Sequence, residues 1–264
     1  MPYSAKIFSV KTYSAKTISA KTIGGWDVDA LNFFNVVTIL TGAQKTSVNS
    51  LVQSLKANSL WTKFYAIYPI VGGTAASHSY NLKNPYGFRI TWVGGVTHTA
   101  NGVDFDGTTG YGKTGLIPNT TMTINNTGFD YYSREDSVGA TVGFGAVNSG
   151  TQQIRMFMGT TYTSYQYDST GGSVAGTIAD TVGLLSINRL SSISHSIHKS
   201  GILIASNTTS GGTLPTVELY FGAANSAGTP ANFNNRQCAF ASIRQGLTTT
   251  ETATLNTIVE NYQS

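Results

Sequence analysis

Carboxylate pairs would be the first requirement if this chain cleaved glycosidic bonds. That reaction needs two carboxyl groups facing each other across a groove, roughly 5 to 9.5 Å apart. Glu135 and Asp136 are neighbours in the sequence, so on a strand their side chains point to opposite faces. Glu218, in VELYF, is the one glutamate in an expected inner strand, and Glu251 is explained as a helix cap. The acidic residues therefore predict no catalytic site, and we expect no enzyme activity.

Two aspartates are spaced for a calcium site. Asp104 and Asp106 share one face of a strand ahead of Gly107, and their oxygens are ligands that calcium prefers. The alternative, which we favour, is that Val103 and Phe105 fill the core while the aspartates face water and Asp106 serves the turn. We expect no metal here.

The histidines and the cysteine offer little further chemistry. His195 and His198 are three apart, a spacing that suits zinc on a helix but separates the two rings on the strand that we expect. We expect His78 and His98 to hold loops in place by hydrogen bonds, and Cys238 to be a free, buried thiol. Because the sequence has no glycine-rich phosphate loop, Ser-His-Asp order or CxxC motif, we expect no cofactor.

Tyrosines are the remaining candidates for contact with a ligand. Tyr162, Tyr165 and Tyr167 form a tyrosine-rich segment whose rings could stack on sugars or contact another subunit. The alternative is ordinary packing between neighbouring strands. These three residues are our candidates for glycan contact.

The first 25 residues contain a five-residue repeat and the whole net charge of the chain. The remaining 12 basic residues (16 − 4) are matched by 12 acids, so four lysines account for the formal charge of +4. The repeat consists of the apolar residues Tyr3, Phe8, Tyr13 and Ile18 and the lysines Lys6, Lys11, Lys16 and Lys21.

This period of five excludes a single helical stripe, because an α-helix has about 3.6 residues per turn. On a strand it places apolar residues on both faces, which favours burial between partners. The alternative is a solvated basic tail; nucleic-acid binding is disfavoured because the rest of the chain is electrically balanced. We predict an arm for assembly with partner proteins and for homo-oligomer formation, with a trimer favoured.

Composition excludes several classes of protein. Charged residues are 11% of the chain, while glycine and hydroxyl and amide side chains are abundant, as in exposed β-proteins and virus fibres. The N-terminus lacks the continuous apolar core of a signal peptide, and no window approaches a membrane span. We therefore expect no membrane partner.

Hydrophobic spacing predicts the elements that must position these residues. Val48, Leu51, Val52 and Leu55 fall on one helical face, with Thr46 or Ser47 as the cap and an end near Leu60, whereas residues 26–41 are ambiguous. From residue 65 a dozen short strands indicate a sandwich or jelly roll, with hairpin turns at 106–107 and 199–201. Thr248 and Glu251 form a capping box before a closing helix, whose apolar face is formed by Leu255, Ile258, Val259 and Tyr262.

The stretch LVQSLKANSLWTKFYAIYPIVGG, followed by GGVTHTANGVDFDGTTGYGKTGLIP, resembles a module of bacteriophage virion proteins. In that module a short helix leads into a concanavalin A-like, laminin-G-type jelly roll. The resemblance implies a mostly β sandwich with a short helix before it and a C-terminal helix. The expected parts of the chain are an extended repeat arm (1–25), a partly helical connector (26–64) and a jelly-roll domain (65–264). The arm is not part of the module, and we infer that it attaches the chain to other virion proteins.

The resemblance also implies a function and a location. The leading hypothesis is a structural bacteriophage virion protein, a head fibre or capsid decoration, exposed on the particle and anchored by its arm. The alternative is a tail-fibre or receptor-binding adhesin that recognises host surface polysaccharide. One sandwich fold carries many functions, so the resemblance does not decide between the two.

Overall fold

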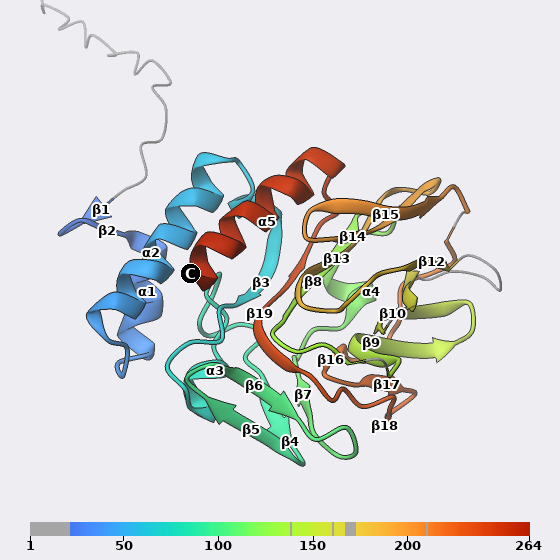
Figure 1. Cartoon of the computed structure of the whole chain (residues 1–264), viewed down its shortest axis with the longest axis horizontal. Helices are drawn as coiled ribbons and strands as arrows, with labels where there is room; N and C mark the ends of the chain where they lie inside the picture. The colour runs from blue at the N-terminus through green and yellow to red at the C-terminus, as the bar shows by residue number, and fades with distance from the viewer. Residues whose placement is uncertain (1–21, 138, 160, 167–172, 210) are drawn as a thin grey trace, which may run out of the picture.

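The strand-rich part of the sequence folds into two sheets that face each other (Figure 1). The computed structural model describes residues 22–137, 139–159, 161–166, 173–209 and 211–264. The eight-stranded sheet has the order β15 (Ile202–Asn207), β14 (Ser194–Lys199), β13 (Gly183–Ser191), β8 (Thr127–Ser133), β19 (Gln237–Arg244), β6 (Gly102–Phe105) and β5 (Val96–Thr99), with β3 (Phe64–Tyr68) also paired to β19.

The second sheet has nine strands within the described ranges. Its order is β12 (Val174–Thr177), β11 (Thr161–Gln166), β10 (Gln152–Met158), β9 (Thr141–Ser149), β16 (Tyr220–Phe221), β7 (Tyr111–Lys113) and β4 (Thr91–Val93), while β17 (Ala224–Ser226) pairs with β9 and β18 (Thr229–Ala231). The β17–β9 pair is parallel and the other pairs are antiparallel.

Alternation along the strands builds the core between the sheets. In β8, Phe129 and Tyr131 are completely buried and pack against Phe144 and Met156 of the opposite sheet. Asp130 and Tyr132, between and after them, point to the other face, as the two-residue period of a strand requires. The sheet therefore has a second face that needs its own cover.

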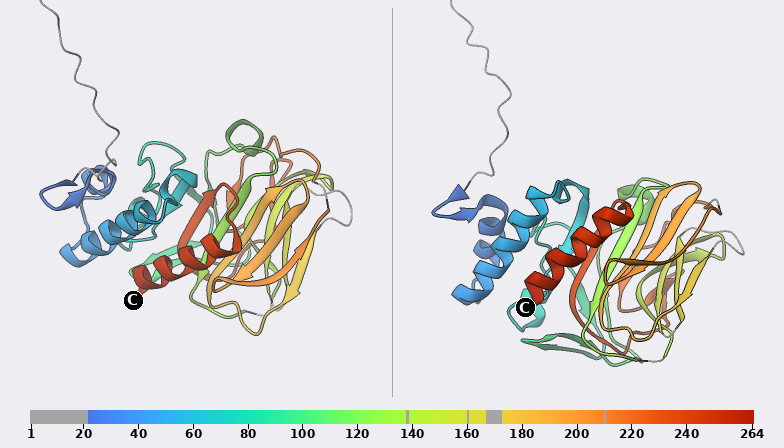
Figure 2. Two further views of the ribbon diagram at one scale, coloured as in Figure 1. Left: turned by 90° about the horizontal axis from the view of Figure 1, so that it is seen from above. Right: turned by 45° about the horizontal axis from the view of Figure 1, so that its top comes forward.

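Helices cover that second face (Figure 2). The helical elements are α1 (Val28–Val36), α2 (Gly42–Ala57), the 3-10 turn η1 (Trp61–Lys63), α3 (Ala75–His78), α4 (Pro118–Thr121) and α5 (Thr249–Gln263). Leu51 and Leu55 of α2 and Leu255 of α5 share a second apolar core with Ile67 and Phe240 of the sheet. The result is three layers: the helices pack on the eight-stranded sheet, and the other face of that sheet packs on the nine-stranded sheet.

The predicted fold class is confirmed, and the closing helix begins with the predicted capping box of Thr248 and Glu251. The predicted start of the earlier helix is wrong. Its cap is Thr41, whose side chain accepts from the Gln44 N–H while the Gln44 side chain accepts from the Thr41 N–H. The ambiguous segment 26–41 contains α1, which begins after the cap Asp27.

One of the two predicted hairpin turns is confirmed. Ser200 and Gly201 join β14 to β15 with φ of 48° and 75°, the left-handed geometry that suits the twist of a hairpin. The turn at Asp106 and Gly107 instead carries the chain from β6 in one sheet to β7 in the other, so the hairpin predicted there is wrong.

At the N-terminal end of the described residues, Gly24 and Gly25 form the turn of a small hairpin between β1 (Thr22–Ile23) and β2 (Trp26–Asp27). Their φ angles of 59° and 87° are ones that glycine adopts without strain. Among the described residues, no helix has the length and hydropathy to cross a membrane.

Candidate functional site

A cleft opens where α1 meets the loop between α3 and β4. Its volume is about 310 Å³, at the lower end of the range for small-molecule sites. Tyr86 lines it with 84% of its surface exposed, so its ring is available to a ligand. We name this feature the Tyr86 cleft; it is lined by Asp29, Asn32, Asn35, Leu82, Lys83, Asn84, Pro85 and Tyr86.

The loop that carries Tyr86 is fixed by amide hydrogen bonds. The buried side chain of Asn81 accepts from the Lys83 N–H at 2.9 Å and donates to the Gly87 carbonyl at 3.0 Å. The Asn84 side chain accepts from the Tyr86 N–H at 3.2 Å, and the Gly87 N–H donates to the Asn84 carbonyl at 3.0 Å. The exposed ring therefore projects from a closed turn.

Helix α1 contributes polar groups to the cleft. Asn32 and Asn35 are three apart and exposed on one face, and neither side-chain amide has a hydrogen-bond partner within the described part of the chain. The Lys56 ammonium lies 2.6 Å from both Asp27 and Asp29. Burial opposes the charge on Lys56, but the hydrogen bonds to the two aspartates outweigh it and raise its pKa.

Lys83 is the one cation among the lining residues, and it packs on an aromatic ring. The Lys83 ammonium lies 4.3 Å from the centroid of the Trp61 ring, and burial lowers its pKa. Asp29 is the one carboxylate among the lining residues and is already paired with Lys56. An exposed aromatic ring can pack against the C–H face of a sugar, and free amides beside it can bind the hydroxyls of that sugar.

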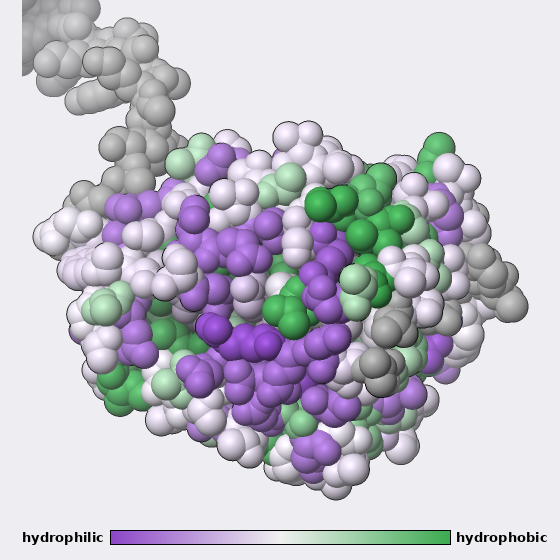
Figure 3. Space-filling model, viewed as in Figure 1, coloured by the Kyte–Doolittle hydropathy of each residue, from purple (hydrophilic) through white to green (hydrophobic). Residues whose placement is uncertain are grey.

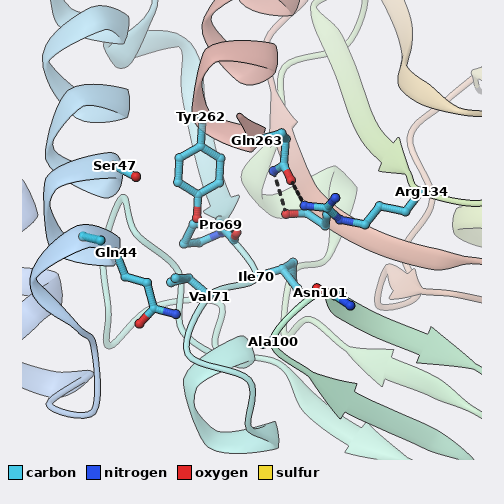
Figure 4. Close-up of a pocket in the computed structure, with 12 residues that line it drawn as sticks. Gln44, Ser47, Pro69, Ile70, Val71, Ala100, Asn101, Arg134, Tyr262 and Gln263 are labelled. Atoms are coloured by element: carbon cyan, nitrogen blue, oxygen red, sulfur yellow. Dashed lines mark hydrogen bonds between the residues drawn. The ribbon is translucent and has the colours of Figure 1, made fainter.

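A second cleft, of about 200 Å³, lies between α2, the end of α5, the β3–α3 loop and the β5–β6 turn (Figure 4). None of its lining residues is a carboxylic acid. We name it the α2–α5 cleft; its lining is Ala43, Gln44, Ser47, Pro69, Ile70, Val71, Ala100, Asn101, Arg134, Ala239, Tyr262 and Gln263.

Hydrogen bonds from the end of α5 fix two walls of the α2–α5 cleft. The Tyr262 hydroxyl donates to the Pro69 carbonyl at 2.9 Å, and the Gln263 side chain donates to the Ala239 carbonyl at 3.1 Å. Arg134 follows β8 and donates from Nη2 to the Gln263 side-chain oxygen at 2.7 Å (Figure 4). The closing helix thus positions both the loop and the arginine.

The predicted loop-holding role of His78 and His98 is confirmed. The Gly73 N–H donates to His78 Nε2 at 3.2 Å, so the neutral ring carries its proton on Nδ1, which donates to His98 Nδ1 at 3.1 Å. Burial lowers the pKa of both histidines, that of His78 to about 3. The pair ties the β3–α3 loop to β5.

A buried polar cluster in the eight-stranded sheet lines neither cleft. Arg244 and Asp130, both with fully buried side chains, form an ion pair at 2.6 Å, and the Asp130 oxygens also accept from Ser186 and Ser242. Arg244 donates to Asn188 at 2.6 Å, which satisfies a further donor of its guanidinium. Such a closed network holds β8, β13 and β19 together and presents no group to a substrate.

The metal candidates are occupied by other contacts. Asp106 Oδ1 accepts the N–H groups of Thr108, Thr109 and Gly110 within 2.9 Å, and hydrogen bonds led by that of the Thr109 hydroxyl hold the pKa of Asp106 well below its usual range. Asp104 accepts from Gln237 at 3.0 Å. Across the described ranges, no three His, Cys, Asp or Glu side chains are grouped as metal ligands.

The histidines of β14 are likewise part of the interior. His195 and His198 are both buried on this strand, as the serine- and isoleucine-rich segment predicts. His198 lies 3.3 Å from the Asn188 amide, and burial lowers its pKa to about 4. Cys238 is the predicted buried free thiol, and burial raises its pKa.

Of the predicted glycan-contact tyrosines, Tyr162 is completely buried in the core between the sheets, so its ring cannot reach a ligand at the surface. The Tyr165 side chain and all of Tyr167 lie outside what the structure describes, so both stay predictions. The predicted assembly residues of the arm also lie outside the described residues: Tyr3, Lys6, Phe8, Lys11, Tyr13, Lys16, Ile18 and Lys21.

Sequence reasoning did not find Tyr86. Its signal is the tetrapeptide Asn84-Pro85-Tyr86-Gly87, a strong turn pattern. This pattern predicts that Tyr86 lies near the surface, but it does not predict that the ring is exposed. Arg134 was also missed, because its partner Gln263 lies at the far end of the chain.

Comparisons with known proteins give matches in structure. No family model and no curated protein matches the sequence. A sialidase from Trypanosoma rangeli, in complex with 2,3-difluorosialic acid, aligns with a TM-score of 0.50 and 13% identity over 80% of this chain and 38% of that chain. A mutant of HCR/D aligns with a TM-score of 0.52 and 11% identity over 76% of this chain and 53% of that chain.

Domain 4 of AbnA, a GH43 extracellular arabinanase from Geobacillus stearothermophilus, was solved with arabinotriose and aligns with a TM-score of 0.43 at 14% identity, over 73% of this chain and 98% of that chain. This chain spans about two fifths of the sialidase and about half of HCR/D. At such low identities the two higher-scoring matches establish the fold alone, which is a β-sandwich.

Proposed function

We propose that this chain is a non-catalytic adhesin that binds surface glycans through the Tyr86 cleft. The observation that carries the proposal is the exposed Tyr86 ring, fixed on a hydrogen-bonded turn beside the unpaired amides of Asn32 and Asn35. The absence of an unpaired carboxylate from the lining supports binding without hydrolysis.

Binding to an array of bacterial surface polysaccharides tests this function. The unaltered chain should bind a subset of them saturably, and Tyr86→Ala should weaken that binding at least tenfold, because the ring supplies most of the apolar contact. Tyr86→Phe keeps the ring and should retain binding. Ile193→Ala, which removes a 62% exposed side chain outside the cleft, is the matched control.

A second candidate function is a structural virion protein, a head fibre or capsid decoration that also forms a homo-oligomer. The observation that favours it is the repeat arm with the whole net charge, joined to the folded part at Gly24 and Gly25. An apolar patch on β15, where Ile202 is 68% and Leu203 44% exposed, offers a surface for contact between subunits (Figure 3).

Deletion of residues 1–25 tests the proposed attachment. The described members of the two apolar cores all follow residue 25, so the truncated chain should stay folded and soluble. It should fail to join bacteriophage particles, which immunogold labelling of purified particles would measure. Normal incorporation of the truncated chain would contradict the role of the arm.

A further inference from the structure

We propose that the α2–α5 cleft is a second sugar site, specific for a carboxylate-bearing sugar, and that Arg134 contacts the carboxylate. The inference rests on the proposed function, because it names a class of glycan for the same sandwich. It concerns different residues from those of the Tyr86 cleft, so the two assignments can be tested separately.

Charge is the first argument for an acidic ligand. Arg134 is the one side chain of the lining that is charged at neutral pH, and it forms no ion pair within the described part of the chain. Its guanidinium donates one hydrogen bond, to Gln263 at 2.7 Å, which fixes its position and leaves other N–H groups free. A fixed, exposed guanidinium is suited to a carboxylate, which it can bind through two parallel hydrogen bonds.

Neutral donors and acceptors surround the arginine. The Gln44 oxygen is used in the cap of α2, which leaves its amide nitrogen for a ligand. The side chains of Ser47 and Asn101 have no hydrogen-bond partner among the described residues, and both line the cleft. Figure 4 shows Gln44 and Ser47 on α2, facing the end of α5 across the cleft. Amides and hydroxyls without acids are suited to sugar hydroxyls.

The loop that lines the cleft is held in a conformation that needs support. Ile70 has a φ of 48°, a left-handed value that is rare for a β-branched residue. The strain is maintained from both sides, by the Tyr262 hydroxyl on the Pro69 carbonyl and by His78 on the Gly73 N–H. Strained backbone that the surrounding structure over-determines is typical of binding sites.

The number of charges distinguishes a carboxylate from a phosphate. A single arginine balances one negative charge, whereas a phosphate monoester carries about 1.5 to 2 at neutral pH and is usually met by several donors or cations. The small side chains of Ala43, Ala100 and Ala239 leave about 200 Å³, which limits the ligand to a single ring.

Chemical-shift titration of the isotope-labelled full chain tests the proposal. Methyl glucuronide should shift the side-chain amide resonances of Gln44, Asn101 and Gln263, and methyl glucoside, which lacks the carboxylate, should shift them much less. Arg134→Gln should weaken glucuronide binding at least tenfold. Arg134→Lys, which keeps the charge but loses the two parallel N–H donors of the guanidinium, should weaken it less. Arg89→Gln is the control, because Arg89 is exposed and stacked on Tyr80 outside the cleft.

Each outcome separates this inference from the proposed function. The carboxylate site is overturned if the chain does not bind glucuronide. It is also overturned if Arg134→Gln has the melting temperature of the unaltered chain and binds glucuronide equally well. Tighter binding of glucoside 6-sulfate than of glucuronide overturns the choice of carboxylate. If the carboxylate site fails in either way but neutral glycans still bind and need Tyr86, the proposed function stands. If no neutral glycan binds but glucuronide binds and needs Arg134, only the assignment of the Tyr86 cleft is overturned.

Discussion

Two histidines connect the loops beside the α2–α5 cleft, and both must be neutral to do so. His78 uses Nε2 to accept from Gly73 and Nδ1 to donate to His98, so a second proton on either ring breaks one of these bonds. His78 is 1% exposed, so burial disfavours an added charge on its ring. The neutral rings of His78 and His98 therefore fix the loop that lines the α2–α5 cleft.

This pair predicts a stability that falls in acid. Burial lowers the pKa of His78 to about 3, below the 6.5 of the unfolded chain, so the unfolded state binds more protons between these values. Stability should be constant above pH 6.5 and decrease below it, by up to about 3 kcal/mol at pH 4. Urea unfolding at several pH values measures the slope.

A matched variant isolates this contribution. His78→Gln with His98→Gln should have a shallower slope between pH 6.5 and 4. The residual slope should come mainly from His198, whose pKa burial also lowers, to about 4, with a smaller part near pH 4 from Glu251, whose pKa is lowered as well. An unchanged slope would show that the pair is already protonated or open in the native state.

The sequence does not predict which individual tyrosines are buried. Tyr162 and Tyr86 are the same residue type in polar surroundings, yet one is 0% and the other 84% exposed. Tyr162 lies on the inner face of β11, and the strand pattern does not say which of its faces is covered. Tyr86 follows a proline in a turn, so no strand or helix period describes it.

Element boundaries were harder to predict than element types. The apolar face of α2 is confirmed at Val48, Leu51, Val52 and Leu55, which are all buried. Its first turn contains no large apolar residue, so the periodicity begins after the helix does. The sequence Thr41-x-x-Gln44 is a capping-box pattern that locates the true start.

This cap can be tested by a pair of threonines. Thr41→Ala should destabilise the protein by about 1 kcal/mol, because it leaves an N–H group of the first turn without its partner. Thr46→Ala should change stability by less than about 0.5 kcal/mol, since Thr46 is an exposed helical residue that merely donates to the Gly42 carbonyl. Equal effects in thermal unfolding would contradict the assigned start.

The whole molecule assembles its clefts from distant parts of the chain. The α2–α5 cleft joins Gln44, Arg134 and Gln263, and the Tyr86 cleft joins α1 to a loop about 50 residues later. Composition and strand spacing are sufficient to predict a sandwich with a closing helix. They do not predict which loops the helices contact to form the clefts. Those contacts depend on packing between segments that are far apart in the sequence, which hydrophobic periodicity does not describe.

We propose that the whole molecule, a β-sandwich with a helical layer, presents Tyr86 to a sugar. The most direct test is the binding isotherm of the full chain with a glycan identified on the polysaccharide array, measured beside Tyr86→Ala and Tyr86→Phe. We predict saturable binding that Tyr86→Ala weakens at least tenfold and Tyr86→Phe retains. Unchanged affinity in a folded Tyr86→Ala variant would contradict the account.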